Sequence, residues 1–189
     1  MEMKLASYLH IAGLALLTVP AMAEAKGITY DCDTAADHFS ELSLPAEGIS
    51  FTVSGNVQLK TLAASSKYVP LARIQIASSA MPGQNPEFYA GFVLTALPAD
   101  PKKTPSGASA VQMLSWNLNG KKDEILPLSV MTVPGTVQPF TLSYDGNKVL
   151  VTLGNETKSF PLKTTDPVVR LICSTGEFLF TDLIITPSR

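Results

Sequence analysis

The residues of this chain whose types could do chemistry are few and far apart in the sequence. The 189 residues include two cysteines, Cys32 and Cys173, and two histidines, His10 and His38. A Ser-His-Asp triad would need His38 as its base, because His10 lies in an apolar leader, and no Gly-x-Ser-x-Gly motif accompanies it. The same count excludes a histidine-rich zinc site. We therefore assign no catalytic residue and no cofactor from the sequence.

With a catalytic triad and a zinc site excluded, the residue types still allow catalysis by a pair of carboxylates. Glycoside hydrolysis requires two of them about 5–10 Å apart across a cleft. In this sequence Glu87 and Glu177 are isolated, and Asp123 and Glu124 are adjacent, so that they would point to opposite faces of a strand. A carbohydrate-active hydrolase or lyase would have to draw its carboxylates from different strands, and this stays an alternative function.

A small acidic cluster near the first cysteine consists of Asp31, Asp33 and Asp37. Carboxylate oxygens are ligands that Ca²⁺ accepts, six to eight at a time, although the spacing matches no EF-hand loop. We favour a strand end followed by a helix cap, in which the carboxylates stabilise the helix N-terminus. The cluster is kept as a candidate calcium site, and no other metal site is predicted.

Trp116 is the only tryptophan, and it stands beside the amides of Asn117 and Asn119. An exposed tryptophan can stack on a sugar ring while the two amides hydrogen-bond to its hydroxyl groups. These three residues are therefore the candidate ligand-binding site. A single tryptophan is more often a core residue, and we favour that interpretation on composition alone.

The first 23 residues have the layout of a cleavable signal peptide. Lys4 is followed by an apolar stretch from Ile11 to Val19 and by the small-residue pattern Ala21-Met22-Ala23. The stretch is too short for a transmembrane helix, which needs about 20 apolar residues. We expect residues 1–23 to be removed, leaving a secreted or periplasmic protein with no membrane span in its mature chain.

The remaining residues, 24–189, have a suitable length for a single domain. The net charge of −2 comes from scattered acidic and basic residues, and this excludes the basic stripe that nucleic acid binding requires. In an oxidising compartment we expect a disulfide between Cys32 and Cys173. Because bonded Cα atoms lie about 5–6 Å apart, the first and last strands must then lie side by side.

Alternation of apolar and polar residues recurs after residue 26 and predicts an all-β domain of about ten to twelve strands. Ile49 to Leu59 is expected to form a hairpin that turns at Gly55-Asn56. Phe140 to Leu153 is expected to form another, which turns at Asp145-Gly146. The chain should close with two strands separated by a turn at Ser174-Thr175-Gly176.

Three other segments carry a prediction. The run Arg73-Ile74-Gln75-Ile76 alternates and should belong to a well-buried strand. A short helix is expected over Thr34 to Leu42, with Asp33 as its N-cap. The proline-rich stretch from Pro98 to Gly107 should be a long exposed loop.

The hairpin FTLSYDGNKVLVTL and the closing segment CSTGEFLFTDLII both lie between Phe140 and Thr186. This segment, about a quarter of the chain, resembles the terminal part of concanavalin A-like lectin, glucanase and laminin-G-type domains, in which a YDG-type hairpin precedes a last strand that returns beside the first. The resemblance implies an antiparallel β-sandwich of jelly-roll type with at most one or two short helices. Those families include carbohydrate-binding modules, lectins, glucanases and adhesion domains, so the resemblance implies a fold rather than a function.

The function predicted from the sequence is noncatalytic binding by an exported module. Sandwiches present loops and sheet faces for recognition, and no catalytic constellation is visible. The expected partner is a carbohydrate or an envelope or extracellular protein. The alternatives are the carbohydrate-active enzyme described above and a structural or assembly protein of the cell envelope, which would expose an apolar patch or an unpaired edge strand.

Overall fold

The computed structural model describes residues 27–46, 48–63, 67–81, 84–98, 110–119, 124–132 and 135–188. For the strand residues between 97 and 132 it describes the backbone alone. The expected signal peptide and nearly all of the expected proline-rich loop lie outside the described residues, and they stay predictions together with the boundaries of the single domain. In the described part, no helix is long and apolar enough to span a membrane.

The described residues form ten β-strands and no helix. In chain order these strands are β1 (Ile28–Pro45), β2 (Phe51–Leu62), β3 (Leu71–Ser78), β4 (Tyr89–Pro98), β5 (Ala110–Asn119), β6 (Glu124–Thr132), β7 (Val137–Tyr144), β8 (Lys148–Leu153), β9 (Glu156–Pro161) and β10 (Pro167–Pro187). All of the pairings between them are antiparallel.

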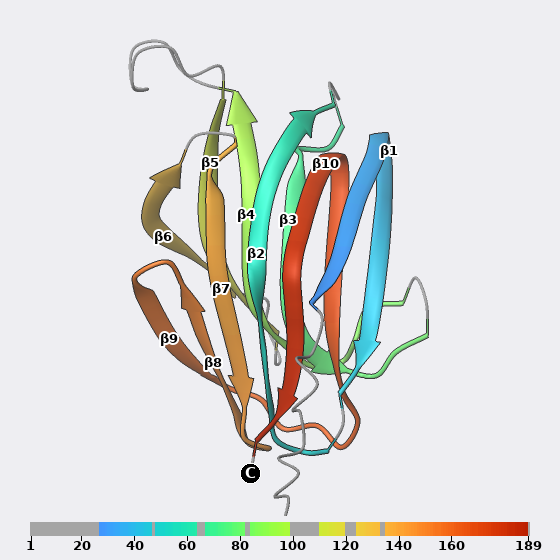
Figure 1. The fold of residues 1–189 in the computed structure, drawn as a ribbon, viewed down its shortest axis with the longest axis vertical. Coiled ribbons are helices and arrows are strands. Elements are labelled where there is room, and N and C mark those ends of the chain that lie inside the picture. Colours follow the sequence, from blue (N-terminus) through green and yellow to red (C-terminus); the bar gives the residue numbers. More distant parts are fainter. Residues whose placement is uncertain are drawn as a thin grey trace, which may run out of the picture.

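The long strand β10 connects two layers of the molecule. Its first half, up to Ser174, pairs with β3, whereas its second half, from Gly176, pairs with β2. Hydrogen-bonded neighbours therefore run in the order β6-β5-β4-β3-β10-β2-β7-β8-β9, and β1 pairs with both halves of β10. Figure 1 shows β2, β7, β8 and β9 in one layer, here called the β2 layer, and β3, β4, β5 and β6 in the other, the β3 layer.

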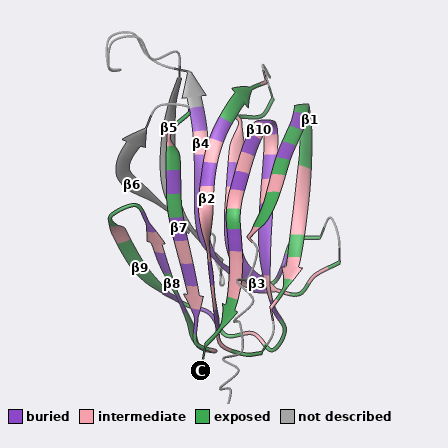
Figure 2. Ribbon diagram, viewed as in Figure 1, coloured by how far each residue is buried: buried purple, intermediate pink, exposed green. Residues whose placement is uncertain are grey.

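The core fills the space between the two layers. Phe92 of β4 and Phe140 of β7 meet across it, with ring centroids 5.6 Å apart in an edge-to-face arrangement. Figure 2 shows buried residues alternating with more exposed ones along the strands, as expected when one face of each strand packs inward. The all-β antiparallel sandwich of jelly-roll type predicted from the sequence is confirmed.

The predicted helix over Thr34 to Leu42 is wrong. The segment belongs to β1, and its pairing with β10 shifts register between Thr34 and Phe39, where Asp37 has a φ of 66°. Ala35, Ala36, Phe39 and Leu42 could share one face of a helix, but they lie instead in an edge strand that crosses from one layer to the other. Pairing with β10 supplies this segment with backbone hydrogen bonds, which outweighs a weak local preference for a helix.

Two predicted turns are also absent. Gly55-Asn56 lies inside the continuous strand β2, and Ser174-Thr175-Gly176 lies inside β10, where Thr175 has a φ of 59°. A Cβ atom at Gly55 would lie 2.7 Å from Leu183, so this glycine permits close packing instead of a turn. At Thr175 the chain bends while pairing continues, which lets one strand serve both layers.

The hairpin predicted at Asp145-Gly146 is confirmed, with Gly146 at a φ of 94°. The side chain of Asp145 accepts hydrogen bonds from the backbone N–H groups of Asn147 and Lys148, at 3.0 and 2.9 Å. These bonds are the principal reason that the pKa of the Asp145 carboxyl is lowered. Turn chemistry read from the sequence is reliable here because the hydrogen bonds that Asp145 makes are local.

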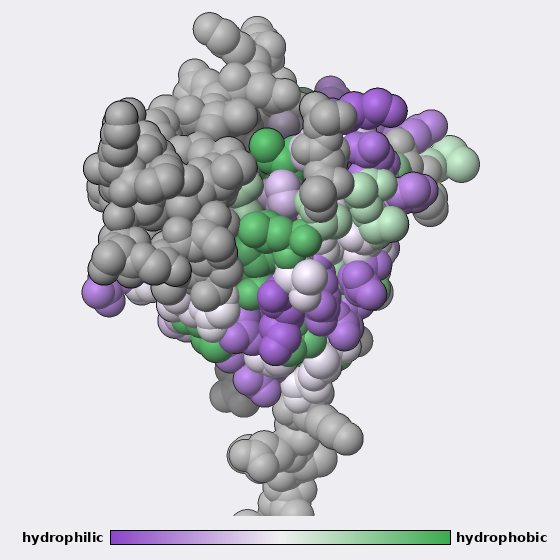
Figure 3. Space-filling model, turned by 90° about the horizontal axis from the view of Figure 1, so that it is seen from above, coloured by the Kyte–Doolittle hydropathy of each residue, from purple (hydrophilic) through white to green (hydrophobic). Residues whose placement is uncertain are grey.

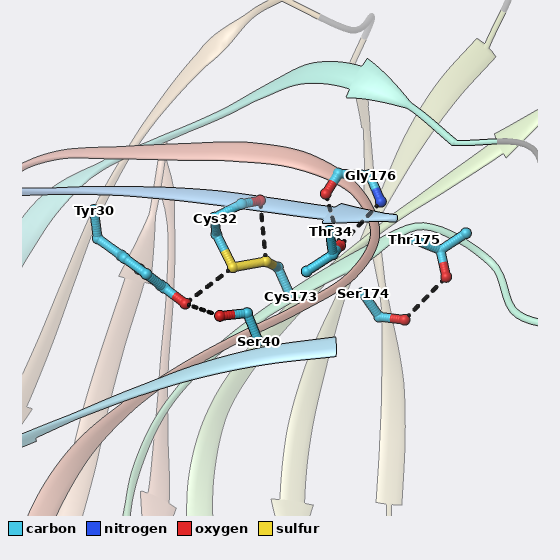
Figure 4. The surroundings of a disulfide bond; sticks show 8 residues. All are labelled: Tyr30, Cys32, Thr34, Ser40, Cys173, Ser174, Thr175 and Gly176. Atoms are coloured by element: carbon cyan, nitrogen blue, oxygen red, sulfur yellow. Dashed lines mark hydrogen bonds between the residues drawn. A yellow bond between two sulfur atoms is a disulfide. The ribbon is translucent and has the colours of Figure 1, made fainter. Parts of the chain in front are cut away.

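The predicted disulfide between Cys32 and Cys173 is present, with Cα atoms 6.3 Å apart. Cys32 pairs in register with Phe178 in the β2 layer, whereas Cys173 pairs with Ser40 in the β3 layer. The bond therefore crosses between the layers where β1 and β10 pass from one to the other. Figure 4 shows this arrangement and the hydroxyl of Tyr30, 3.2 Å from Cys32 Sγ.

Candidate functional site

Polar side chains gather on the outer face of the β3 layer. Arg73 and Gln75 of β3 alternate with buried isoleucines that point into the core. Gln75 lies opposite Arg170 of β10. Arg73 lies opposite Ile172 of β10, and on the other side of Ile172 lies Glu41 of β1. Opposed residues in a sheet share a face, so three adjacent strands bring two arginines, a glutamate and a glutamine together.

Arg170 and Glu41 form a bidentate ion pair. Arg170 Nε donates to Glu41 Oε1 at 2.8 Å, and Nη2 donates to Oε2 at 2.6 Å. Their side chains are 5% and 16% exposed. The hydrogen bonds from Arg170 lower the pKa of the Glu41 carboxyl, against the opposing effect of burial. Arg170 Nη2 also donates to the carbonyl of Gln84, 3.2 Å away.

Several buried polar atoms next to this ion pair have no hydrogen-bond partner among the described residues. They are Arg73 Nε, Arg170 Nη1 and both amide atoms of Gln75, a residue that is only 1% exposed. Such atoms cost free energy unless a partner satisfies them, so an ordered water, an ion or a functional role must account for them.

An open pocket of about 260 Å³ lies against this cluster. It is lined by Phe39, Glu41, Arg73, Gln84, Asn85, Arg170 and Ile172. Glu41 is the only carboxylate in this lining, and it is already paired with Arg170. Arg73 therefore has no acidic partner of its own among the residues that line the pocket, and the pocket suits an anionic group that accepts hydrogen bonds.

The neighbouring strand β4 brings Tyr89 and Gly91 to the same face. Gly91 pairs with Gln75, and Tyr89 pairs with Ala77. A Cβ atom on Gly91 would lie 2.6 Å from the Cα of Gln75, so only glycine fits this close approach of β4 to β3. Tyr89 is 6% exposed and is a diagonal neighbour of Gln75, a separation that long side chains can span.

The candidate sugar-binding residues lie in β5 of the same layer. Trp116 pairs in register with Phe92, Asn117 with Gly91, and Asn119 with Tyr89. Their side chains lie outside the described part of the structure, so their role stays a prediction. The backbone of Asn117 is nevertheless only two strands from Gln75, on the far side of Gly91.

The other residues singled out from the sequence lie away from this pocket. Asp31 and Asp33 are exposed on the first half of β1, and Asp37 lies where β1 crosses between the layers. Within the described residues, no three acidic, histidine or cysteine side chains are grouped so that they could hold a metal ion. His38 is exposed, and its Nδ1 lies 2.8 Å from the carbonyl of Ala36.

Arg73, Gln75, Glu41 and Arg170 were not identified from the sequence. The sequence held two signals. Arg73 and Gln75 alternate with isoleucines in a strand expected to be buried, and Arg170 stands inside the apolar run from Val168 to Cys173. Polar residues at such positions require partners. Which residues partner them depends on β1 and β10 lying beside β3, and the sequence does not reveal that neighbourhood.

A second surface feature lies at the end of the sandwich where β2 and β4 finish. Seen from that end, Figure 3 shows apolar side chains gathered at the centre, with hydrophilic ones to one side. Leu62 and Val69 are among the exposed apolar residues, at 39% and 45%. Apolar surface offers a polar ligand neither charge nor hydrogen-bond donors, so the pocket beside Arg73 is the better candidate site.

No family model matches the sequence, and no curated protein matches it either. Solved structures do resemble the fold. The polysaccharide lyase family 18 enzyme aly-SJ02 has a TM-score of 0.53 at 8% identity, and the match covers 88% of this chain and 90% of that one. The alginate lyase AlgAT5 of polysaccharide lyase family 7 has a TM-score of 0.51 at 12% identity, over 87% and 79%. An alginate lyase from Alteromonas sp. 272 has a TM-score of 0.50 at 8% identity, over 74% and 72%.

These similarities correct the prediction of a noncatalytic binding module. The similar solved structures reported above are lyases, which favours the alternative of a carbohydrate-active enzyme over the function preferred from the sequence. Identities of 8–12% establish a shared fold and nothing finer. The chain therefore has the concanavalin A-like β-sandwich fold, which it shares with polysaccharide lyases.

Proposed function

We propose that this protein is a polysaccharide lyase that cleaves an acidic polysaccharide in the pocket on the outer face of the β3 layer. The observation that carries the proposal is Arg73 in the pocket lining, where it has no acidic partner of its own. Buried polar atoms of Arg73, Arg170 and Gln75 that have no partner among the described residues lie beside it. The similarity in fold to lyases that act on alginate, an anionic polymer, supports the same class of substrate.

Elimination from a uronic acid residue needs the chemistry that this pocket offers. A base removes the proton from the carbon next to the carboxylate, the bond from the β-carbon to the glycosidic oxygen breaks, and a carbon–carbon double bond forms. The departing oxygen takes up a proton, so atoms balance without water or a redox partner. Negative charge develops on the substrate carboxylate during proton removal, and the guanidinium of Arg73, which lines the pocket, would stabilise it.

The two arginines have different roles in this proposal. Arg170 is held by Glu41 and by the Gln84 carbonyl, which fixes its guanidinium and neutralises most of its charge. Arg73 has no acidic partner in the pocket lining. Arg73 would therefore bind the substrate carboxylate, while the Arg170–Glu41 pair keeps the floor of the pocket rigid.

Tyr89 is our candidate for the proton transfers. It lies on the same face as Gln75. Its phenolate form could remove the proton, and the phenol formed in that step could return the proton to the departing oxygen. A two-carboxylate hydrolase fits less well, because Glu41 is the only carboxylate lining the pocket and is engaged by Arg170.

Export of the protein is part of the same proposal. The predicted signal peptide and the disulfide between Cys32 and Cys173 support a periplasmic or extracellular location, where thiols oxidise and large polysaccharides occur. Expression with residues 1–23 in place, followed by mass spectrometry of the exported protein, tests this directly. An N-terminus at Glu24 or Lys26 supports export, whereas an intact leader in the cytoplasm contradicts it.

The activity test uses ultraviolet absorbance, because elimination creates a double bond conjugated with the carboxylate. Wild-type protein should release absorbing products from at least one of alginate, pectate or a glycosaminoglycan. Arg73→Ala and Tyr89→Phe should each lower the rate by about 100-fold or more. Arg73→Ala should also weaken substrate binding, whereas Tyr89→Phe should not.

Lys60→Ala, at an exposed cation on β2, is the matched control and should leave the rate unchanged. New reducing ends without ultraviolet absorbance would show hydrolysis and overturn the lyase proposal. Full activity of Arg73→Ala would place the site elsewhere.

A further inference from the structure

Phe39 is an aromatic side chain that the fold leaves in solvent. It is 66% exposed, and it is not among the apolar residues that pack against the core. Burial of a phenylalanine side chain stabilises a protein, and Phe39 gains little of this stabilisation. The ring of Phe39 therefore lies in solvent, on the strand β1, and not in the core.

That position is the rim of the pocket described above. Phe39 lines the pocket together with Glu41, Arg73 and Arg170. After the register shift between Thr34 and Phe39, β1 pairs with the half of β10 that belongs to the β3 layer. Phe39 is the first residue of this pairing and lies opposite Ser174. Phe39 and Glu41 are two residues apart on one strand and so lie on the same face. The ring of Phe39 therefore lies beside the charged cluster, two residues along β1 from Glu41.

The size of the pocket explains why an aromatic rim would be useful. Its volume of about 260 Å³ is below the range of roughly 300–1,000 Å³ that is typical of small-molecule sites. A pocket of this size holds one sugar residue of a polymer, so the neighbouring residues must lie over its rim. Arg73 in the pocket would bind a charged group, and a flat apolar ring at the rim suits the face of a pyranose, which carries C–H groups.

We infer that Phe39 is the platform of an adjoining sugar subsite, on which the residue next to the one bound at Arg73 stacks. The inference rests on the proposed function, because the polymer is the substrate assigned to the same pocket. Phe39 touches no reacting bond in this arrangement. It sets affinity for the polymer and the register in which the polymer lies across the pocket.

The test compares Phe39→Ala with Phe39→Trp, using affinity electrophoresis through gels that contain alginate or pectate, and steady-state kinetics on polymer and on short oligosaccharides. Phe39→Ala should raise the dissociation constant for the polymer by roughly 5- to 10-fold. It should raise KM for the polymer to a similar degree and leave kcat within about twofold. Phe39→Trp should match or exceed the wild-type affinity, because it retains an aromatic face.

Leu150→Ala is the matched control, because Leu150 is also an exposed apolar residue but lies in β8 of the other layer. It should leave polymer binding unchanged. Unchanged binding and KM in Phe39→Ala would overturn the inference, and so would a wild-type protein that binds no polysaccharide. A wild-type dimer that Phe39→Ala converts to a monomer in sedimentation experiments would overturn it as well, by assigning the ring to contact between two copies.

The two proposals fail in different ways. Polymer binding that depends on Phe39, without release of any unsaturated product, would refute the lyase activity and leave the subsite standing. Lyase activity that is lost in Arg73→Ala but unaffected in Phe39→Ala would refute the subsite alone.

Discussion

At the scale of single residues, the binding properties of the outer face of the β3 layer depend on which charged side chains there form ion pairs. Glu41 and Arg170 satisfy one another, and the pKa of Glu41 is lowered chiefly by the hydrogen bonds from Arg170. Arg73 lies in the same pocket without such a partner. In the proposed function, one arginine is therefore structural and the other binds the ligand, a distinction that residue type alone does not make.

The Glu41–Arg170 pair predicts a pH dependence of stability. Because the pKa of Glu41 is lowered from its ordinary value of 4.5 by folding, ionised Glu41 stabilises the protein above about pH 4.5, and this contribution is lost as the pH falls through the lower folded pKa. Glu41→Gln should lower the free energy of unfolding by about 2 kcal/mol at pH 7, since Arg170 stays buried with a weaker acceptor.

Urea unfolding of wild type and Glu41→Gln across pH 3–7 measures this difference. The two curves should converge at acidic pH, where wild-type Glu41 is itself protonated. A difference that stays constant down to pH 3 would show that the effect comes from packing rather than ionisation.

At the scale of elements, the spacing between strands β3 and β4 depends on Gly91. The glycine lies opposite Gln75, and a side chain there would meet the backbone of Ile74 and Gln75. Tyr89 is two residues from Gly91 on β4, so the register puts it on the same face as the arginines. The role of the glycine is thus to permit contact between strands, and no positive φ is involved.

Gly91→Ala should therefore destabilise the protein by about 2–3 kcal/mol, at the upper end of the cost of overpacking, because backbone atoms can move little. Thermal unfolding monitored by circular dichroism measures the loss. Thr95→Ala, on the same strand and face, serves as the control and should cost less than about 1 kcal/mol. Equal melting temperatures for Gly91→Ala and wild type would mean that the two strands have room to separate.

At the scale of the whole molecule, β1 and β10 hold the two layers of the sandwich together. Both strands contribute one half to each layer, and the disulfide links Cys32 of one layer to Cys173 of the other. The sequence separation of 141 residues makes the bond a constraint on nearly all of the described chain. It also lies at the crossing that sets Phe39 and Glu41 in their places on β1.

The double variant Cys32→Ala and Cys173→Ala should lose about 2–4 kcal/mol of the free energy of unfolding, because the unfolded chain is no longer cross-linked. Urea unfolding should show a lower midpoint and a larger m-value, since the unfolded state exposes more surface. A midpoint within error of the wild-type value would show that strand pairing alone joins the layers.

The sequence by itself determined those features that rest on local chemistry. Alternation along the strands predicted the all-β class, and Asp145-Gly146 predicted its hairpin. Two cysteines behind a predicted signal peptide predicted their bond. It failed at Gly55-Asn56, at Ser174-Thr175-Gly176 and over Thr34 to Leu42. In those segments long-range pairing with β10 or close packing outweighs the local preference.

The tertiary structure alone decided where the candidate site lies. Arg73, Glu41 and Arg170 are far apart in the chain, and none belongs to a recognisable motif. They meet because β10 lies between β3 and β1, and because the register puts their side chains on one face. Strand order and register are set by contacts across the whole core, which no local pattern of residues encodes.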